Sequence, residues 1–373
     1  MTATANSVWA VIAGGGTSGH VHPALALAGE LVRRGRQPGE LHFIGSKRGL
    51  EAELVPEHGY TLTALPGRGI ERRVNLQNLR SLFGIGAAAA QSVLVLRKLR
   101  PAILVTVGGY ASFPAVAAAA LLRIPIVVME QNTVPGAANR FASRWAKVCA
   151  VSFADTDLPN AVHTGNPSSP EILAVDRDRG GEAARGRLGV EPGRRLVAAF
   201  GGSLGARRIN QAVVDATREL AHRSDLAIRH VIGARDWPLF GEHVVNDELQ
   251  YQPVRYERAM HDIYQGADFV VSRAGATSVA EIAETGTPAI LVPLPGAPGD
   301  HQTRNAQSLT TVGGGILIAD SDLDGPRLAG IIEELLADPA SIAAMSLAAQ
   351  AKARPNAAGD IADLVEKHAR EQQ

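Results

Sequence analysis

A glycine-rich turn occurs twice in the 373-residue chain, each time between a short apolar run and a helical pattern. The copies are Gly14-Gly15-Gly16-Thr17-Ser18-Gly19 and Gly201-Gly202-Ser203-Leu204-Gly205. The runs at 8–13 and 196–200 are typical of buried strands, and segments 23–34 and 209–220 carry apolar residues at helical spacing. Two strand–turn–helix units, about one domain apart, predict two Rossmann-like domains facing a shared cleft.

The length and composition agree with two globular domains. A chain of 373 residues is too long for one ordinary core, because domains average about 150 residues. The single cysteine, Cys149, allows no internal disulfide, so we expect a reduced cytoplasmic setting. The first apolar run is short and lacks a basic leader, so no secretory signal is expected.

Further strand-like runs alternate with helical ones and predict an α/β fold with a doubly wound parallel sheet in each domain. They lie at 41–44, 103–107, 126–129, 148–152, 227–232, 269–272, 289–292 and 315–318. We expect domains at 1–165 and 166–340, with a hinge at 165–170. A C-terminal helical segment, 341–373, could pack back on the first domain.

One uncharged stretch, 101–122, is long enough to span a membrane. Pro101, Gly108-Gly109 and Pro114 instead divide it into a strand, a turn and an alanine-rich helix. We therefore expect no transmembrane segment.

The formal net charge of zero argues against a nucleic-acid partner held by bulk charge. The charge is unevenly divided, because residues 1–165 hold 16 Lys/Arg against 9 Asp/Glu and the remainder 21 against 28. This asymmetry predicts that the first domain meets an anionic partner.

The first glycine turn also satisfies the G-x-G-x-x-G fingerprint of dinucleotide-binding proteins. In those proteins the next strand ends in an acidic residue for the ribose, whereas here it is followed by Lys47 and Arg48, which suit a 2′-phosphate. An NAD(P)-dependent oxidoreductase stays an alternative, although it leaves the second turn unused.

Beyond these turns, the chain resembles the MurG family of glycosyltransferases in seven motifs. They are Gly15-Gly16-Thr17-x-Gly19-His20-Val21-x-Pro23, Gly108-Gly109-Tyr110-Ala111-Ser112-x-Pro114, Glu130-Gln131-Asn132, Gly165-Asn166-Pro167, Gly201-Gly202-Ser203-x-Gly205-Ala206-Arg207-x-x-Asn210, Ser272-Arg273-x-Gly275-Ala276-x-x-x-x-Glu281 and Asp300-His301-Gln302-Thr303-x-Asn305-Ala306. The resemblance implies the GT-B fold and transfer of N-acetylglucosamine, with inversion, from UDP-N-acetylglucosamine to the lipid-linked muramyl-pentapeptide precursor of peptidoglycan. It implies no cofactor and a place on the cytoplasmic face of the membrane. Other GT-B enzymes, such as a UDP-sugar epimerase or a glycolipid synthase, and an inactive binding protein stay open as alternatives.

The donor site implied by the resemblance draws on both domains. The second glycine turn, with Ser203, would hold the donor diphosphate through backbone N–H groups. Glu281 would accept both ribose hydroxyls, whereas Glu284 is expected to be solvated. The full expected donor set is Thr17, Ser18, Gly19, Asn132, Ser203, Arg273, Ala276, Glu281, His301, Gln302 and Asn305. Two structural alternatives stay open. Arg273 could form a surface ion pair instead of contacting the donor, and the polar run at 300–305 could be an ordinary helix start capped by Asp300.

On the acceptor side, His20 is the candidate general base, because imidazole titrates near neutrality and the residue follows the first turn. It could equally hydrogen-bond the acceptor diphosphate. The expected acceptor-binding residues are Gly15, Gly16, Gly109, Tyr110 and Ser112. His20 and His22 lack a third ligand at convincing spacing, so no metal is expected.

One position departs from the family pattern. After Gly165-Asn166-Pro167 the family usually has an arginine two residues on, whereas this chain has Ser168-Ser169. A donor-phosphate contact is therefore expected to be missing, and donor affinity to be lower.

The segment 68–100 combines seven basic residues and one acid with many apolar side chains. We expect it to rest on an anionic membrane surface, although apolar residues in the core with solvated arginines would give the same pattern. The expected contact residues are Ile70, Arg72, Arg73, Leu76, Leu79, Arg80, Leu82 and Phe83.

Overall fold

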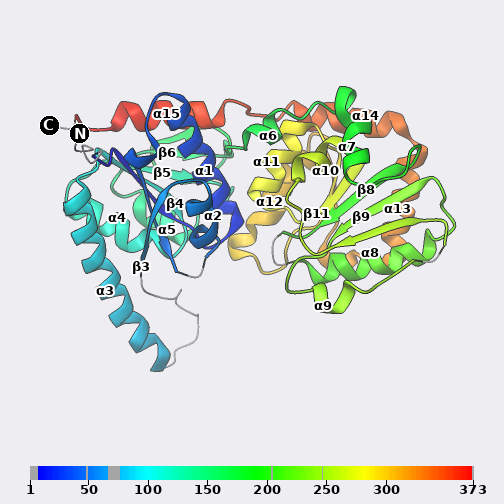
Figure 1. The fold of residues 1–373 in the computed structure, drawn as a ribbon, viewed down its shortest axis with the longest axis horizontal. Helices are drawn as coiled ribbons and strands as arrows, with labels where there is room; N and C mark the ends of the chain where they lie inside the picture. Colours follow the sequence, from blue (N-terminus) through cyan, green and yellow to red (C-terminus); the bar gives the residue numbers. More distant parts are fainter. Residues whose placement is uncertain (1–6, 48, 66–75, 203–204, 246, 372–373) are drawn as a thin grey trace, which may run out of the picture. The chain divides into compact units, whose positions relative to one another are not determined.

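The computed structural model describes residues 7–47, 49–65, 76–202, 205–245 and 247–371, and the backbone alone at 76–85. Contacts divide the chain into two compact units, Met1–Ser168 with Asn356–Gln373, and Ser169–Pro355. Each unit is built around one parallel sheet (Figure 1). The predicted α/β class with two doubly wound domains is confirmed.

The strands of the first unit are β1 Ala10–Gly14, β2 Leu41–Ser46, β3 Thr61–Leu65, β4 Ile103–Gly108, β5 Ile126–Glu130, β6 Ala146–Val151 and β7 Ala161–His163. They pair in the order β3-β2-β1-β4-β5-β6-β7, all parallel. The side chains of β1 alternate between two cores, Ala10 and Ile12 in one and Val11 and Ala13 in the other. The strand order reverses between β1 and β4, and ligands of such sheets bind beyond the carboxyl ends of the strands at that reversal.

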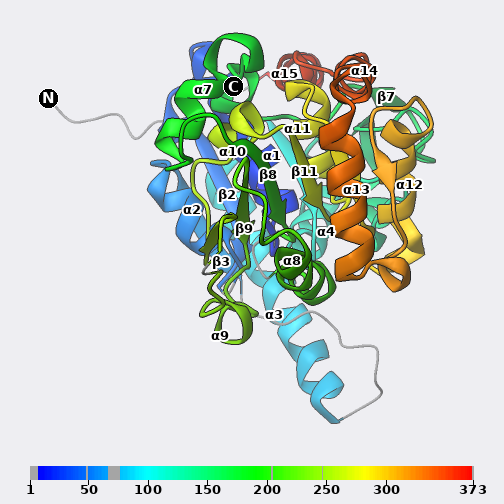
Figure 2. The same ribbon diagram turned by 90° about the vertical axis from the view of Figure 1, so that its right-hand side faces the viewer.

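The helices of this unit are α1 Ser18–Arg33, α2 Glu51–Glu57, α3 Leu76–Leu99, α4 Ser112–Leu121, α5 Ala137–Ala142 and α15 Ala357–His368, with a 3-10 turn at Pro38–Glu40. Helices cover both faces of the sheet, because α1 and α15 supply one core and α3 and α4 the other. α3 extends away from the sheet in both Figures 1 and 2.

The last helix, α15, packs beside α1 and adds Ile361, Ala362 and Val365 to the core beneath it. Arg34, directly after α1, forms ion pairs with α15. One of its guanidinium nitrogens lies 2.6 Å from a carboxylate oxygen of Asp363 and 2.9 Å from one of Glu366.

The strands of the second unit are β8 Arg195–Phe200, β9 Leu226–Val231, β10 Gln250–Val254, β11 Phe269–Ser272, β12 Ala289–Leu291 and β13 Ile316–Leu317. They pair in the order β10-β9-β8-β11-β12-β13, again all parallel. The strand order again reverses beside the strand that precedes the glycine turn, here β8.

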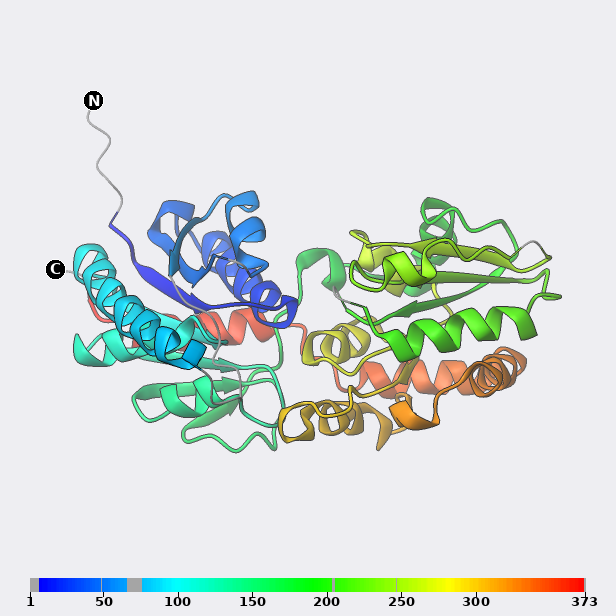
Figure 3. The same cartoon turned by 90° about the horizontal axis from the view of Figure 1, so that it is seen from below.

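Its helices are α6 Pro170–Leu173, α7 Arg177–Arg187, α8 Arg207–Glu219, α9 Trp237–Phe240, α10 Met260–Gly266, α11 Ala276–Thr285, α12 His301–Thr310, α13 Gly325–Ala337 and α14 Pro339–Gln350, with 3-10 turns at Pro298–Asp300 and Asp320–Asp322. α8 is strongly amphipathic and packs on β8 and against α13 (Figures 2 and 3). The C-terminal segment expected from 341 divides: α14 packs on α11 and α13 within the second unit, and only α15 lies in the first.

The strands predicted from apolar runs are all present, within a few residues. The stretch 101–122 forms β4 and α4, and no helix within the described ranges is long and apolar enough to cross a membrane. The sequence did not predict the strands β3, β7 and β10, which all lie at sheet edges. β10 carries Pro253 and partly exposed residues, as edge strands tolerate.

Candidate functional site

The first glycine turn joins β1 to α1 at the point where the strand order reverses. Gly14, Gly15 and Gly16 all have positive φ, at 142°, 136° and 100°. The N–H of Gly15 donates to the carbonyl of Gly108 at 3.3 Å, and a Cβ at Gly109 would overlap the Gly15 carbonyl. The two turns, 14–16 and 108–109, are therefore in direct contact through glycine backbone.

His20 lies in the first turn of α1, and its ring is held by the preceding threonine. Thr17 occupies the N-cap position, but its hydroxyl makes no capping bond and instead meets Nδ1 of His20 at 3.0 Å. When Nδ1–H donates to this hydroxyl, Nε2 keeps a lone pair with which it can accept a proton. Nε2 lies close to Gly108, because a Cβ at that glycine would be 3.4 Å from it.

A buried carboxylate organises the loop after β5. Glu130 is 2% exposed and accepts the backbone N–H groups of Asn132 at 2.9 Å and Gly136 at 3.0 Å. The side-chain amide of Asn139 adds a bond of 2.9 Å, and that of Asn132 one of 3.3 Å. The expected donor residue Asn132 is thus fixed by Glu130. The motif contained Glu130, but nothing in the sequence pointed to Asn139.

The acceptor residues expected around 109–112 differ in what they can reach. Ser112 is fully buried, and its hydroxyl donates to the Gly109 carbonyl at 2.8 Å, so it shapes the turn. Tyr110 is half-buried, and burial raises the pKa of its phenol. Ser18 and Gly19 lie in the first turn of α1, where backbone N–H groups have no helical partner.

The second glycine turn joins β8 to α8. Gly202 and Gly205 have φ values of 88° and 89°, whereas Ser203 lies outside the described residues. A Cβ at Gly205 would overlap the carbonyl of Ile232 and lie 3.1 Å from Asp236. Asp236 has no exposed surface and pairs with Arg235 at 3.0 Å and Arg207 at 3.7 Å. Two arginines therefore flank one carboxylate beside this turn.

Asn210 connects that carboxylate to the interior. Its amide nitrogen donates to the carbonyl of Ile232 at 3.0 Å and to Asp236 at 3.2 Å, so its oxygen accepts from Nε2 of His230 at 3.0 Å. Nδ1 of His230 then accepts the hydroxyl of Tyr251 at 2.8 Å. Burial lowers the pKa of His230 to about 3, with His243 nearby adding to the effect, so the imidazole is neutral.

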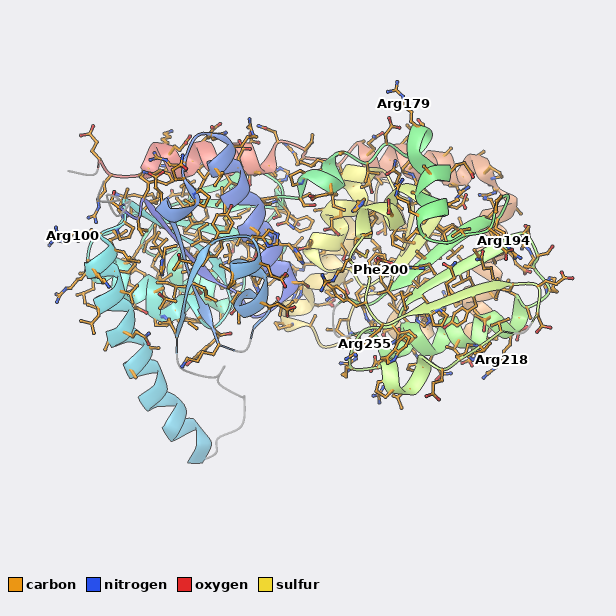
Figure 4. All side chains as sticks on the ribbon, viewed as in Figure 1. Arg100, Arg179, Arg194, Phe200, Arg218 and Arg255 are labelled. Atoms are coloured by element: carbon orange, nitrogen blue, oxygen red, sulfur yellow. The ribbon has the colours of Figure 1, made fainter. Side chains whose placement is uncertain are left out.

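Glu281 lies on α11 with a tyrosine bonded to its carboxylate. The Tyr264 hydroxyl donates to Oε2 at 2.8 Å, and Phe200 packs edge-on against the Tyr264 ring at 6.0 Å. Figure 4 shows Phe200 at the end of its strand inside this unit. Burial raises the pKa of Glu281 to about 7, against the smaller opposing effect of the tyrosine bond. No motif or periodicity in the sequence pointed to Tyr264.

Arg273 follows β11, and its guanidinium is committed within the unit. One terminal nitrogen donates to the carbonyls of Val292 at 3.1 Å and Pro293 at 3.0 Å, and it lies 2.6 Å from an Asp320 carboxylate oxygen. Its charge is therefore already paired. Ala276, buried, begins α11 three residues further on.

The polar cluster at the start of α12 supports the loops around it. The side-chain oxygen of Gln302 accepts the N–H of Leu294 at 2.9 Å, and Nδ1 of His301 meets the carbonyl of Pro298 at 2.9 Å. Asn305 is fully buried and donates to the Ala274 carbonyl at 3.2 Å. Asp300 occupies the N-cap position without a capping bond from its side chain.

The expectation that Glu284 is solvated holds only in part. Its side chain is half-buried, and its carboxylate accepts the N–H of Arg354 at 2.6 Å. One helical turn beyond Glu281, it therefore bonds to the chain that follows α14 while part of its surface stays exposed.

None of the residues expected to contact the membrane has a described side chain. Residues 70, 72 and 73, and the side chains at 76, 79, 80, 82 and 83, lie outside the described residues. In the described remainder of the first unit, exposed Leu94 on α3 and Leu121 on α4 belong to helices that pack together. Trp145, after α5, is 46% exposed.

The structure thus gathers the predicted residues into two sets. In the first unit Gly15 and His20 lie against the turn at 108–109, and in the second the Asn305 amide donates to the Ala274 carbonyl, between Arg273 and Ala276. Among the residues that the structure describes, no three His, Cys, Asp or Glu side chains are grouped to hold a metal.

Two doubly wound domains, each with a glycine turn after a strand at its topological reversal, are typical of the GT-B fold. Family models agree: the glycosyltransferase family 28 N-terminal domain matches residues 10–151, and the C-terminal domain matches 196–361. The chain belongs to this family and, within it, to the MurG family.

Relatives and solved structures support that membership. Proteins from Nocardioides sp. and Desulforudis audaxviator, each named UDP-N-acetylglucosamine--N-acetylmuramyl-(pentapeptide) pyrophosphoryl-undecaprenol N-acetylglucosamine transferase, are 42% and 36% identical over 91% and 96% of this chain and 93% and 97% of their own. The crystal structure of Acinetobacter baumannii MurG is similar with a TM-score of 0.76 at 28% identity, covering 96% of this chain and 99% of that one. A putative UDP-N-acetylglucosamine 2-epimerase from Listeria monocytogenes, at 14% identity and a TM-score of 0.67 over 96% of each chain, shares the fold alone.

Proposed function

We propose that this enzyme transfers N-acetylglucosamine from UDP-N-acetylglucosamine to the muramyl sugar of N-acetylmuramyl-(pentapeptide) pyrophosphoryl-undecaprenol. The observation that carries the proposal is that relatives named for this reaction match the chain over more than nine-tenths of its length. The paired glycine turns and the Tyr264–Glu281 bond supply residues suited to it.

The second unit would hold the donor. Glu281, once ionised, offers Oε1 and part of Oε2 to the two ribose hydroxyls, and Tyr264 fixes its orientation. The glycine turn with Ser203 offers backbone N–H groups to the diphosphate, where charge develops as UDP leaves. We assign direct contacts to His301, Gln302 and the start of α11 at Ala276, with Asn132, Thr17, Ser18 and Gly19 from the first unit. Asn305 and Arg273, both engaged with neighbouring backbone, would support these contacts from behind.

The first unit would hold the acceptor, with His20 as the base. The Thr17 hydroxyl holds Nδ1, and Nε2 would take the proton of the attacking sugar hydroxyl. The hydroxyl oxygen then bonds to the anomeric carbon as the bond to UDP breaks, so the configuration inverts to a β-linkage. Gly15, Gly16, Gly109, Tyr110 and Ser112 form the surroundings in which the acceptor is expected.

The enzyme would work at the cytoplasmic face of the membrane, where its acceptor is anchored. The excess of basic residues in the first 165 positions supports attraction to anionic headgroups. Exposed Leu94, Leu121 and Trp145 supply apolar contact area in the same unit.

Release of UDP tests the reaction. The purified protein is incubated with UDP-N-acetylglucosamine, with and without the lipid-linked acceptor, and both UDP and the disaccharide product are measured. We expect both to appear in equal amounts, and only with acceptor. Epimerised UDP-sugar without acceptor, or binding of NADPH but not of UDP, would contradict the proposal. A parallel assay in excess chelator should show unchanged transfer.

A further inference from the structure

Glu51, the first residue of α2, is buried under the first glycine turn with 2% of its surface exposed. One carboxylate oxygen accepts the N–H of Gly16 at 2.8 Å, and the other accepts the N–H and the hydroxyl of Ser46, each at 2.8 Å. Within the described ranges no cationic side chain pairs with it. These three bonds therefore replace the water that a buried carboxylate loses.

Three glycines make room for this carboxylate. A Cβ at Gly15 or Gly45 would lie 2.5 Å from a Glu51 side-chain carbon, and one at Gly49 would overlap the carboxylate itself. Gly45 and Gly49 do not have positive φ, so the missing side chain, rather than an unusual backbone, is what these positions require. The chain around Glu51 is thus shaped to its side chain.

The bond from the N–H of Gly16 to Glu51 fixes Gly16, which directly precedes the segment 17–20 with the proposed base His20. Thr17 follows Gly16, and its hydroxyl holds the ring of His20. Gly108 holds the turn on its other side, through the N–H of Gly15. Because Glu51 occupies the N–H of Gly16, the groups left for a substrate oxygen are the N–H groups at the start of α1, in Ser18 and Gly19.

The second glycine turn shows the opposite charge arrangement. There the buried carboxylate, Asp236, is shared by Arg207 and Arg235, so the group beside Gly205 is positive overall. At the first turn the carboxylate of Glu51 has no such cationic partner among the described residues, and its charge opposes a phosphate at the N–H of Gly16. The two turns are therefore suited to different parts of the substrates.

We propose that Glu51 is a positioning residue for the acceptor half of the reaction. By taking the N–H of Gly16 it holds the turn that carries Thr17 and His20, and it keeps phosphate away from that N–H. The inference rests on the proposed transfer reaction and assigns Glu51 no contact with substrate.

The test compares Glu51→Gln with Glu53→Gln, an exposed position on the same helix. Initial rates are measured while acceptor and UDP-N-acetylglucosamine are varied in turn, and UDP binding is titrated separately. Because small displacements of a catalytic group cost much rate, we expect kcat/KM for the acceptor to fall about ten- to a hundredfold in Glu51→Gln. UDP affinity should be unchanged, because the proposed contacts to the ribose and the diphosphate come from the second unit, and Glu53→Gln should match the wild type.

A double-mutant cycle with His20→Ala shows whether Glu51 acts through the turn. If it does, Glu51→Gln costs far less in the His20→Ala background than in the wild type. Equal cost in both backgrounds, or parallel losses of UDP binding and acceptor turnover, would overturn the inference and leave a structural role. Should Glu51→Gln fail to fold, Gly49→Ala displaces the carboxylate sterically, with Gly39→Ala as control because its Cβ would meet nothing within 4 Å.

The outcome is separable from that of the proposed function. A wild-type enzyme that releases no UDP with acceptor would end the proposed function. An active wild type matched by an equally active Glu51→Gln would end only the assignment of Glu51.

Discussion

At the scale of single residues, the raised pKa of the Glu281 carboxylate bears on the ribose-binding role that we propose for it. Burial disfavours its charged form and places the pKa at about 7, above the ordinary value of 4.5. The ionised form accepts hydrogen bonds from two ribose hydroxyls more strongly than the protonated form, in which one oxygen carries a proton. The protonated fraction should therefore limit nucleoside affinity below neutral pH.

We expect uridine to bind about tenfold more weakly at pH 6 than at pH 8, because about a tenth of Glu281 is ionised one pH unit below its pKa. Uridine avoids the phosphate titration of UDP. Calorimetry across this range should show a pH-independent, weaker affinity for Glu281→Gln, and no pH dependence for 2′,3′-dideoxyuridine. The carboxyl also stabilises the fold most below pH 4.5 and loses that contribution as pH rises through about 7, so Glu281→Gln should gain in relative stability above neutrality. A pH-dependent affinity in the variant would assign the titration to another group.

A second residue-scale expectation concerns Ser169, where the family usually has arginine. Ser169 directly precedes α6 and is partly exposed, so a longer side chain has space to extend. If the missing arginine contacts the donor diphosphate, Ser169→Arg should tighten UDP binding about five- to tenfold, the range of one added charge-assisted hydrogen bond. Ser169→Gln, of similar length but uncharged, is the control. Unchanged UDP affinity in Ser169→Arg would remove the idea that this position lowers donor affinity.

At the scale of elements, α15 completes a unit that begins hundreds of residues earlier. Ile361 is 1% exposed in the core formed with α1, and Arg34 ties α15 down through Asp363 and Glu366. We expect Ile361→Ala to lower the free energy of unfolding of the first unit by about 2–4 kcal/mol, because it leaves a cavity in that core. Leu347→Ala on α14, where the side chain is 69% exposed, should change little.

Urea titration with separate probes checks this expectation. With Trp145 and Trp237 replaced by phenylalanine, the fluorescence of Trp9 reports on the first unit, and UDP binding reports on the second. A shift of both transitions in Ile361→Ala would mean that the units unfold together. No shift of either would mean that α15 adds little to the core.

The strands differ in how well their sequence predicts them. Buried strands such as β1 and β4 are continuous apolar runs, so their pattern sufficed, whereas the edge strands β3 and β10 carry threonine, glutamine and proline that an exposed position permits. Candidate site residues within motifs, such as His20 and Glu281, were named through the family resemblance and stay predictions.

The supporting residues were not predictable in this way. Glu51 meets Gly16 across 35 positions, and Tyr264 meets Glu281 across 17. Neither pair shares a periodicity or motif, and only the tertiary fold brings its members together. Asp236 behaves likewise, since its place beside Gly205 depends on the pairing of β8 with β9.

At the scale of the whole molecule, charge is divided unequally between the halves. The first 165 residues carry seven more basic than acidic side chains, and the rest carry seven more acidic ones. Exposed Leu121 and Trp145 lie in the basic half, as do Arg140 and Arg144 near Trp145. Arg100, at the end of α3, also lies at the surface of this unit (Figure 4). Apolar groups that enter a bilayer and arginines at headgroup level together favour an anionic surface.

We therefore expect the protein to sediment with vesicles that contain anionic lipid, and weakly or not at all with neutral ones. Combining Leu121→Ser with Trp145→Ala should reduce binding by about tenfold or more, since each buried apolar side chain is worth about 1.5–3 kcal/mol. Leu239→Ser is the matched control, because Leu239 is 61% exposed but lies in the acidic half. High salt should weaken binding of the wild type, since screening acts on the headgroup contacts. Equal binding to neutral and anionic vesicles would show that the basic half does not direct the protein to the membrane, and equal loss in the Leu239→Ser control would show that any exposed leucine serves.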